Sequence, residues 1–122
     1  MLPEHFTDDE KLYRAVKPLS YFWEKDNNGE LRLSSAALRD SKGLSVDRGY
    51  YRSDDEVIDS MQQKLEGKIA SFEVKDCRTV QALVLYRPTS NCYHSEVHGS
   101  EDKLVLSNFQ RRKLAEVAKI LT

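Results

Sequence analysis

The predicted fold depends most on residues 53–74, whose sequence is SDDEVIDSMQQKLEGKIASFEV. The first half opens with a capping box, in which the side chains of Ser53 and Glu56 each bond the other's backbone N–H. Apolar side chains then recur at helical spacing, and Gly67 is a typical helix stop: Val57, Ile58, Met61, Leu65. In the second half, every other residue is apolar, as in a half-buried strand: Ala70, Phe72, Val74. The stretch therefore predicts a helix followed by a strand.

The flanking sequence extends this pattern in both directions. Residues 82–86 are apolar throughout, which predicts a central strand covered on both faces. Ser107 begins another capping box, and we expect a second main helix over residues 108–121. Asn28-Gly29 favours a tight hairpin turn. Helices and strands are mixed rather than strictly alternating, so we predict an α+β fold: a small, mostly antiparallel sheet with two main helices packed on it.

The shorter segments complete this prediction. Thr7 and Glu10 have capping-box spacing and predict a short helix before a strand over residues 12–16. We expect a connection over residues 75–79, and over residues 34–38 either a one-turn helix or the end of a strand. Further short strands are expected at 31–33, 44–46 and 103–106.

Length and composition limit the classes of protein. The 122 residues predict one domain, 1–122, with residues 1–6 as a flexible N-terminus. Nineteen basic and twenty acidic residues argue against a strongly basic nucleic-acid binder, so we do not expect nucleic acid as a partner. No apolar run is long enough to span a membrane, and the N-terminus does not resemble a signal peptide. We expect a soluble, cytoplasmic protein with two free cysteines.

The segment most suggestive of chemistry is 92–98, with the sequence CYHSEVH. If it is extended, Cys92, His94, Glu96 and His98 lie on one side, because strand side chains alternate. Such residues can bind zinc, and three ligands suffice for an open catalytic site. A metal-free site would use His94 as acid or base, oriented by Glu96. A solvated loop without chemistry is the third interpretation, and we predict no metal and no cofactor.

Three serines are candidate binding residues: Ser34, Ser35 and Ser45. None lies in a Gly-x-Ser-x-Gly nucleophile elbow, and serines in such segments typically form caps and turns. If they line a pocket with His94, their hydroxyls can donate to phosphate or carboxylate oxygens. The candidate site therefore consists of catalytic His94 and Glu96, with Ser34, Ser35, Ser45 and Arg48 binding substrate.

Several short motifs resemble those of a group of small bacterial proteins that have no assigned activity. They are WEKD at 23–26, LSSAAL at 33–38, LSV at 44–46 and YHSEV at 93–97. The chain departs from the group's pattern at Leu33 and Cys92, where the group has prolines, and at Leu38, where it has phenylalanine. The resemblance implies a bacterial source and a shared fold, without implying a reaction.

A second resemblance concerns the start of the chain. Arg14, in an apolar strand context and followed by the serine cluster, is similar to the beginning of ADP-ribosyltransferase-like domains. In those domains, an arginine or histidine on the first strand and a serine on the second hold the nicotinamide nucleotide. The resemblance implies a downstream glutamate, for which Glu96 is one candidate. Judged from the residue alone, the expected role of Arg14 is instead structural, as a buried or snorkelling arginine in a salt bridge.

Small size, balanced charge and the lack of a known catalytic motif lead to one functional prediction. We predict a non-catalytic binding or accessory module that works with a protein partner, in a conflict or defence system. The alternative is a small His-dependent enzyme that acts on a phosphate-containing or nucleotide substrate. The sequence leaves a homodimer open.

Overall fold

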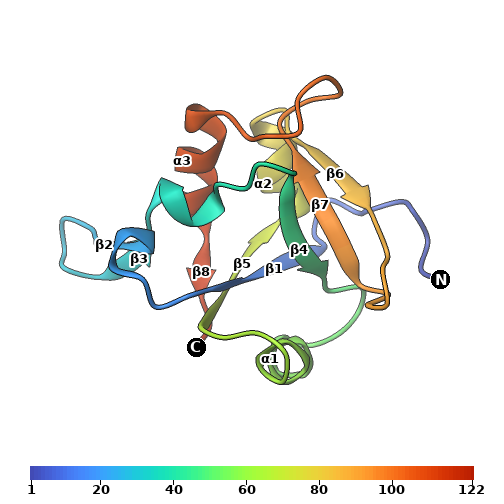
Figure 1. The fold of residues 1–122 in the computed structure, drawn as a ribbon, viewed down its shortest axis with the longest axis horizontal. Helices are drawn as coiled ribbons and strands as arrows, with labels where there is room; N and C mark the ends of the chain where they lie inside the picture. Colours follow the sequence, from blue (N-terminus) through green and yellow to red (C-terminus); the bar gives the residue numbers. More distant parts are fainter.

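The computed structural model describes all residues, 1–122, and is built around one antiparallel sheet of six strands (Figure 1). The strand order is β6-β7-β4-β1-β5-β8. The strands are β1 (Lys11–Val16), β4 (Leu44–Arg48), β5 (Lys68–Glu73), β6 (Leu83–Tyr86), β7 (His94–His98) and β8 (Lys119–Ile120). A separate hairpin pairs β2 (Trp23–Lys25) with β3 (Leu31–Leu33) around the predicted Asn-Gly turn.

Three α-helices accompany the sheet, and the predicted α+β class is confirmed. They are α1 (Asp54–Gln62), α2 (Val74–Thr79) and α3 (Asn108–Val117), with short 3-10 helices at Ser20–Phe22 and Ser35–Leu38. The capping boxes that begin at Ser53 and Ser107 are both formed. No helix combines the length and the apolar character that crossing a bilayer requires.

The sheet has two unequal faces. On one face, the main core joins strand residues such as Leu12 and Val97 to Leu114 of α3 and Cys77 of α2. On the other face, α1 covers only part of the sheet, through a small cluster: Tyr13, Val57, Met61, Ile69. The rest of this second face carries the polar side chains described below.

The sheet splits between β1 and β4. These strands pair at only two positions, Leu12 with Arg48 and Tyr13 with Asp47. Beyond them, residues 14–16 pair only with β5, and residues 44–46 pair only with β7. Strands β1, β5 and β8 therefore separate from β4, β7 and β6 along half of their length.

Two predictions about the strands and connections were wrong. Residues 82–86 were expected to form a central strand, but β6 is an edge strand whose Leu83, Val84 and Leu85 are half-buried. An apolar run does not distinguish an edge strand lying against a helix from a central strand. Residues 75–79 form most of α2 rather than a connection, because the Asp76 carboxylate accepts the backbone N–H of Glu73 at 2.8 Å.

The ends of the predicted elements also need correction. Helix α1 ends at Gln62, so Leu65 is half exposed instead of lying on the buried face. Helix α3 ends at Val117, and the chain continues into β8 beside β5. Residues 103–106 form no strand, and residues 7–10 form a turn instead of a helix. Glu10 does not act in a helix cap, because its carboxylate binds Arg48.

Candidate functional site

Arg14 lies at the split of the sheet and joins its two halves. Its Nε donates to the Ala37 carbonyl at 3.1 Å, and its NH1 donates to the Ser45 carbonyl at 3.0 Å. The side chain thus provides a hydrogen bond where β1 and β4 no longer pair. Burial lowers the pKa of Arg14 from its ordinary value, and Asp40 partly opposes that shift. An arginine still stays charged at neutral pH, so a half-buried cation lies at the split.

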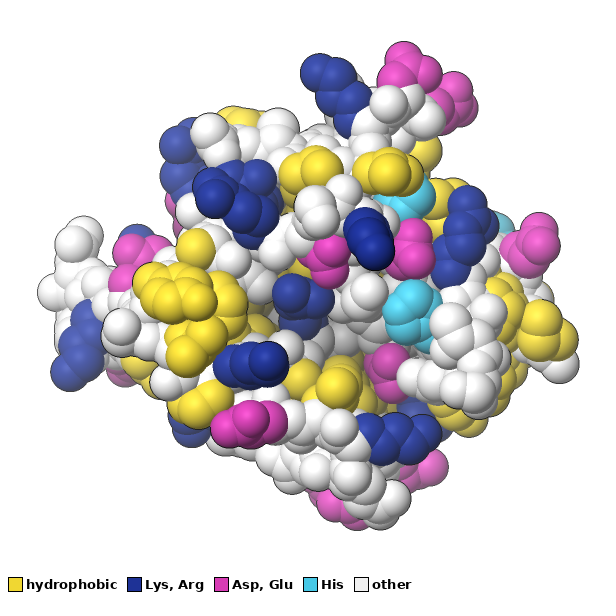
Figure 2. Space-filling view, viewed as in Figure 1, with side chains coloured by type: hydrophobic (Ala, Val, Ile, Leu, Met, Phe, Trp, Pro, Cys, Tyr) yellow, Lys and Arg dark blue, Asp and Glu magenta, His cyan; other side chains and the backbone are white.

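A cavity of about 630 Å³ opens beside Arg14. This volume falls within the range of about 300–1,000 Å³ that is typical of small-molecule sites. The lining includes strand residues, the 3-10 helix at 20–22 and the end of α1: Arg14, Ser45, Asp47, Lys17, Tyr21, Phe22, Met61, Lys64, Asn91, His94. Figure 2 shows a hollow in the middle of this face, with hydrophobic side chains on one side and a histidine with acidic side chains on the other.

Strands β4 and β7 bring four polar residues to this face of the sheet. Ser45 lies directly opposite Glu96, and Asp47 lies directly opposite His94. Residues opposed in this way have Cβ atoms about 4.5–5.5 Å apart. Glu96 therefore neighbours Ser45 on the sheet, although it is not itself among the residues that line the cavity and its carboxylate bonds His98. The half-exposed Asn91 adds an amide, which donates to Asp47 Oδ1 at 3.0 Å.

His94 lines the cavity, but Glu96 does not orient it. Its Nδ1 lies 2.8 Å from the Arg87 carbonyl, which can only accept, so Nδ1 carries the proton and Nε2 is free to accept. The Glu96 Oε1 instead accepts from Nε2 of His98 at 2.9 Å. The two candidate catalytic residues share one face of the sheet without the pairing that we expected. Their catalytic roles stay predictions.

Of the other four candidate residues, only Ser45 lies at the cavity. The Ser34 hydroxyl donates to the Tyr21 carbonyl at 2.6 Å, and Ser35 belongs to the 3-10 helix that follows. Neither is among the residues that line the cavity. Arg48 is fully buried on the opposite face of the sheet, paired with Glu10 at 2.7 Å. The structure thus brings Ser45 and His94 to the cavity, with Glu96 paired opposite Ser45 but not lining it. It adds Arg14, which starts on the core face with Leu12 and Val16 and reaches the Ser45 carbonyl at the split.

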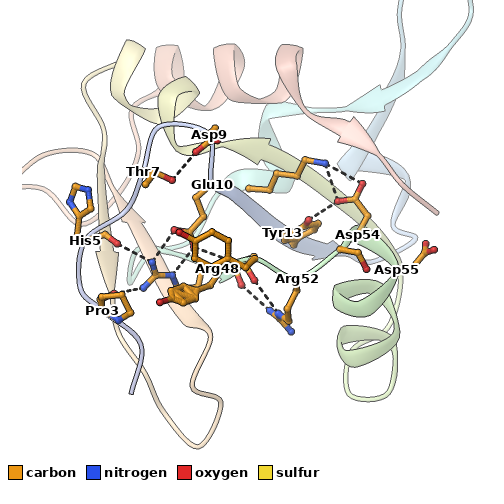
Figure 3. A pocket seen from close by; sticks show the side chains of 15 residues that line it. Pro3, His5, Thr7, Asp9, Glu10, Tyr13, Arg48, Arg52, Asp54 and Asp55 are labelled. Atoms are coloured by element: carbon orange, nitrogen blue, oxygen red, sulfur yellow. Dashed lines mark hydrogen bonds and ion pairs between the residues drawn. The ribbon is translucent and has the colours of Figure 1, made fainter.

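A second hollow, of about 730 Å³, lies between the N-terminal segment, β1 and the start of α1 (Figure 3). Arg48 borders it, but its guanidinium donates to the Glu10 carboxylate and to the carbonyls of Pro3 and His5. Tyr13 donates to Asp54 at 2.6 Å, which lowers the pKa of that carboxyl group, while burial and the same bond raise the pKa of Tyr13. These polar groups bind one another, so the hollow is a structural joint between the N-terminus and α1.

Sequence reasoning missed Asp47 and Asn91, and it placed Arg14 at the site only through a resemblance. A signal for Asp47 was available, because it is two residues after Ser45 and side chains two apart share a strand face. Nothing local indicated Asn91, which reaches Asp47 from the loop before β7.

The zinc alternative finds no support in the geometry. No group of three or more His, Cys, Asp or Glu side chains is arranged to hold a metal ion. Cys92 is exposed, while His98 and Glu96 bind each other. Both cysteines are free thiols, with Cys77 buried.

Comparison with known family models, curated proteins and solved structures finds no significant match for the chain.

Proposed function

We propose that this protein is an enzyme that binds a nicotinamide nucleotide of the NAD⁺ type and transfers its ADP-ribosyl group. One observation carries the proposal: on the neighbouring strands β1, β4 and β7, Arg14 donates to the Ser45 carbonyl and Glu96 pairs opposite Ser45. They are the residue types that the similarity to ADP-ribosyltransferase-like domains assigns to nucleotide binding and to the downstream glutamate. The proposed substrate, a nucleotide, belongs to the substrate class of the alternative prediction from the sequence, a small His-dependent enzyme.

The cavity has the chemistry that a dinucleotide needs. Arg14 uses Nε and NH1 to hold the backbone, which leaves NH2 to donate to a phosphate oxygen. Lys17 and Lys64 also line the cavity, and with Arg14 their positive charges exceed those of the lining acids Asp47 and Glu66, which favours an anionic ligand. Tyr21 and Phe22 offer aromatic surface against which a planar ring can pack.

Glu96 is the residue that we assign to the reaction. The bond between the ribose C1′ and the nicotinamide nitrogen breaks, and nicotinamide leaves with the electron pair as a neutral molecule. Positive charge develops on the ribose, as in other glycosidic cleavages, and a nearby carboxylate stabilises it. Water or an acceptor nucleophile then attacks C1′, and the carboxylate accepts the proton that the nucleophile loses. The register opposite Ser45 supports placing Glu96 next to the bound ribose.

The cavity favours this enzyme over the non-catalytic module. A partner-binding surface does not require a half-buried arginine that lines a concave cavity together with polar side chains such as Ser45 and His94, whereas a small-molecule site typically has such a lining. His94 then contributes a hydrogen-bonding group to the wall, with Nε2 available to the ligand. The partner protein and the defence setting stay predictions from the sequence.

The test is release of nicotinamide from NAD⁺, measured by liquid chromatography, which detects both hydrolysis and transfer to an acceptor. Wild type should release nicotinamide, and Glu96→Gln should lower kcat by about a hundredfold or more with little change in KM. Arg14→Gln should raise KM. The matched control, Glu101→Gln, alters an exposed acid in a loop and should behave as wild type. Wild type that neither binds NAD⁺ nor releases nicotinamide would overturn the proposal.

A further inference from the structure

We infer that His98 is a positioning residue that holds the Glu96 carboxylate for the reaction, an inference that rests on the proposed function. Nε2 of His98 lies 2.9 Å from Oε1 of Glu96, and the His98 side chain is only 10% exposed. The two residues are two positions apart on β7, so their side chains share a face of the sheet. Since a carboxylate only accepts, Nε2 carries the proton of this hydrogen bond.

The imidazole of His98 is fixed by the turn that precedes β4. Gly43 lies against the ring with a φ of +94°, and a Cβ added there would be 2.7 Å from Cδ2 and 2.8 Å from Nε2 of His98. No side chain fits at that position without displacing the ring, and the backbone conformation also favours glycine. The same Cβ would lie 3.4 Å from Oε1 of Glu96, so the turn packs against both members of the pair.

This arrangement gives the two carboxylate oxygens different tasks. Oε1 is held by His98, which restricts the rotamer of Glu96 and leaves Oε2 for the substrate. Ordering a reacting group in advance removes part of the entropic cost of reaching the transition state. Glu96 pairs opposite Ser45, which lines the cavity, whereas His98 lies against Gly43, which does not, so His98 acts through Glu96 and not on the substrate.

Two substitutions at His98 separate this role from simple packing. His98→Leu removes the donor, and His98→Gln keeps an N–H at a similar reach. We expect His98→Leu to lower kcat for nicotinamide release by about ten- to a hundredfold, with KM changed less than about threefold. His98→Gln should recover most of the rate. In the Glu96→Gln background, His98→Leu should lower kcat almost no further. As a control in the otherwise wild-type protein, His5→Leu replaces an exposed histidine and should leave kcat and KM at their wild-type values.

A pair of glycine variants tests the same contact from the other side. Gly43→Ala and Gly29→Ala both place a side chain at positive φ, but the Gly29 position, at +78°, has no atom within 4 Å. If both fold, Gly43→Ala should lose activity as His98→Leu does, and Gly29→Ala should keep it. A Gly43→Ala protein with the wild-type kcat would contradict the inference.

The outcomes separate the two proposals. If wild type is active and the folded His98→Leu keeps the wild-type kcat, the positioning role is wrong while the proposed function stands. If His98→Leu and His98→Gln are impaired equally, the hydrogen bond is not the cause, and the inference is again wrong. If wild type releases no nicotinamide at all, the proposed function fails and the inference falls with it.

Discussion

Substitution of Glu10 by Gln should strongly destabilise the fold, because Glu10 neutralises the most deeply buried charge. The side chain of Arg48 is 1% exposed and that of Glu10 is 8% exposed. Both carboxylate oxygens accept from the guanidinium, at 2.7 and 2.9 Å. Gln keeps the shape of Glu10 but removes its negative charge, so the guanidinium stays buried without a counter-ion.

The expected loss can be estimated from this geometry. Removing one partner of a buried ion pair costs about 3–5 kcal/mol, out of about 5–15 kcal/mol for the folding of a typical domain. In the variant, Arg48 still donates hydrogen bonds to the carbonyls of Pro3 and His5. The centroid of the Phe6 ring also lies 4.0 Å from the guanidinium carbon. We therefore expect the lower end of that range, about 3 kcal/mol.

Urea denaturation followed by circular dichroism measures this loss. The matched control is Glu24→Gln, which breaks the exposed pair between Glu24 and Arg32, 3.5 Å apart. Exposed pairs contribute about 0–1 kcal/mol, so the control should stay close to wild type. If Glu10→Gln costs no more than the control, Arg48 does not depend on Glu10, and a role for Arg48 in substrate binding would have to be reconsidered.

Three further predictions concern single side chains. Cys92 should react with a maleimide dye in the folded protein and Cys77 only after unfolding, because burial raises the pKa of Cys77 to about 12; two reactive thiols in the folded state would contradict this. The Tyr13 hydrogen bond holds the pKa of Asp54 below its ordinary value, so Asp54 stabilises the fold above its unfolded pKa and loses that effect as pH falls through its folded pKa. Urea unfolding of Asp54→Asn should show a loss at neutral pH that shrinks below about pH 4, and a loss independent of pH would refute the cause. Ser107→Ala should cost about 1 kcal/mol in the same assay, because its hydroxyl caps α3; an unchanged midpoint would show that the cap contributes nothing.

Local signals predicted the parts of the fold that depend on neighbouring residues. The capping boxes at Ser53 and Ser107 and the Asn28-Gly29 turn are set within a few residues, and each forms as expected. The position of β6 at the edge of the sheet depends on which strand pairs with β7, and no local pattern contains that information.

The site was only partly predictable for the same reason. Alternation along each strand assigns Ser45 and Glu96 to faces, but their opposition requires β4 and β7 to be neighbours in one register. Arg48 was expected beside Ser45, although residues three apart on one strand point to opposite faces, and β4 extends as far as Arg48. The split that makes room for Arg14 is a tertiary feature.

The central claim, that the cavity at the split binds a nicotinamide nucleotide, is tested most directly by titrating NAD⁺ into ¹⁵N-labelled Glu96→Gln protein. This variant should bind the nucleotide without consuming it. We predict saturable shifts of the backbone amides of Ser45 and His94 and of the Arg14 Nε–H resonance. The dissociation constant from this titration should fall within the usual range of KM values, about 1 μM to 1 mM. No saturable shift, or shifts confined to the hollow beside Arg48, would contradict the account.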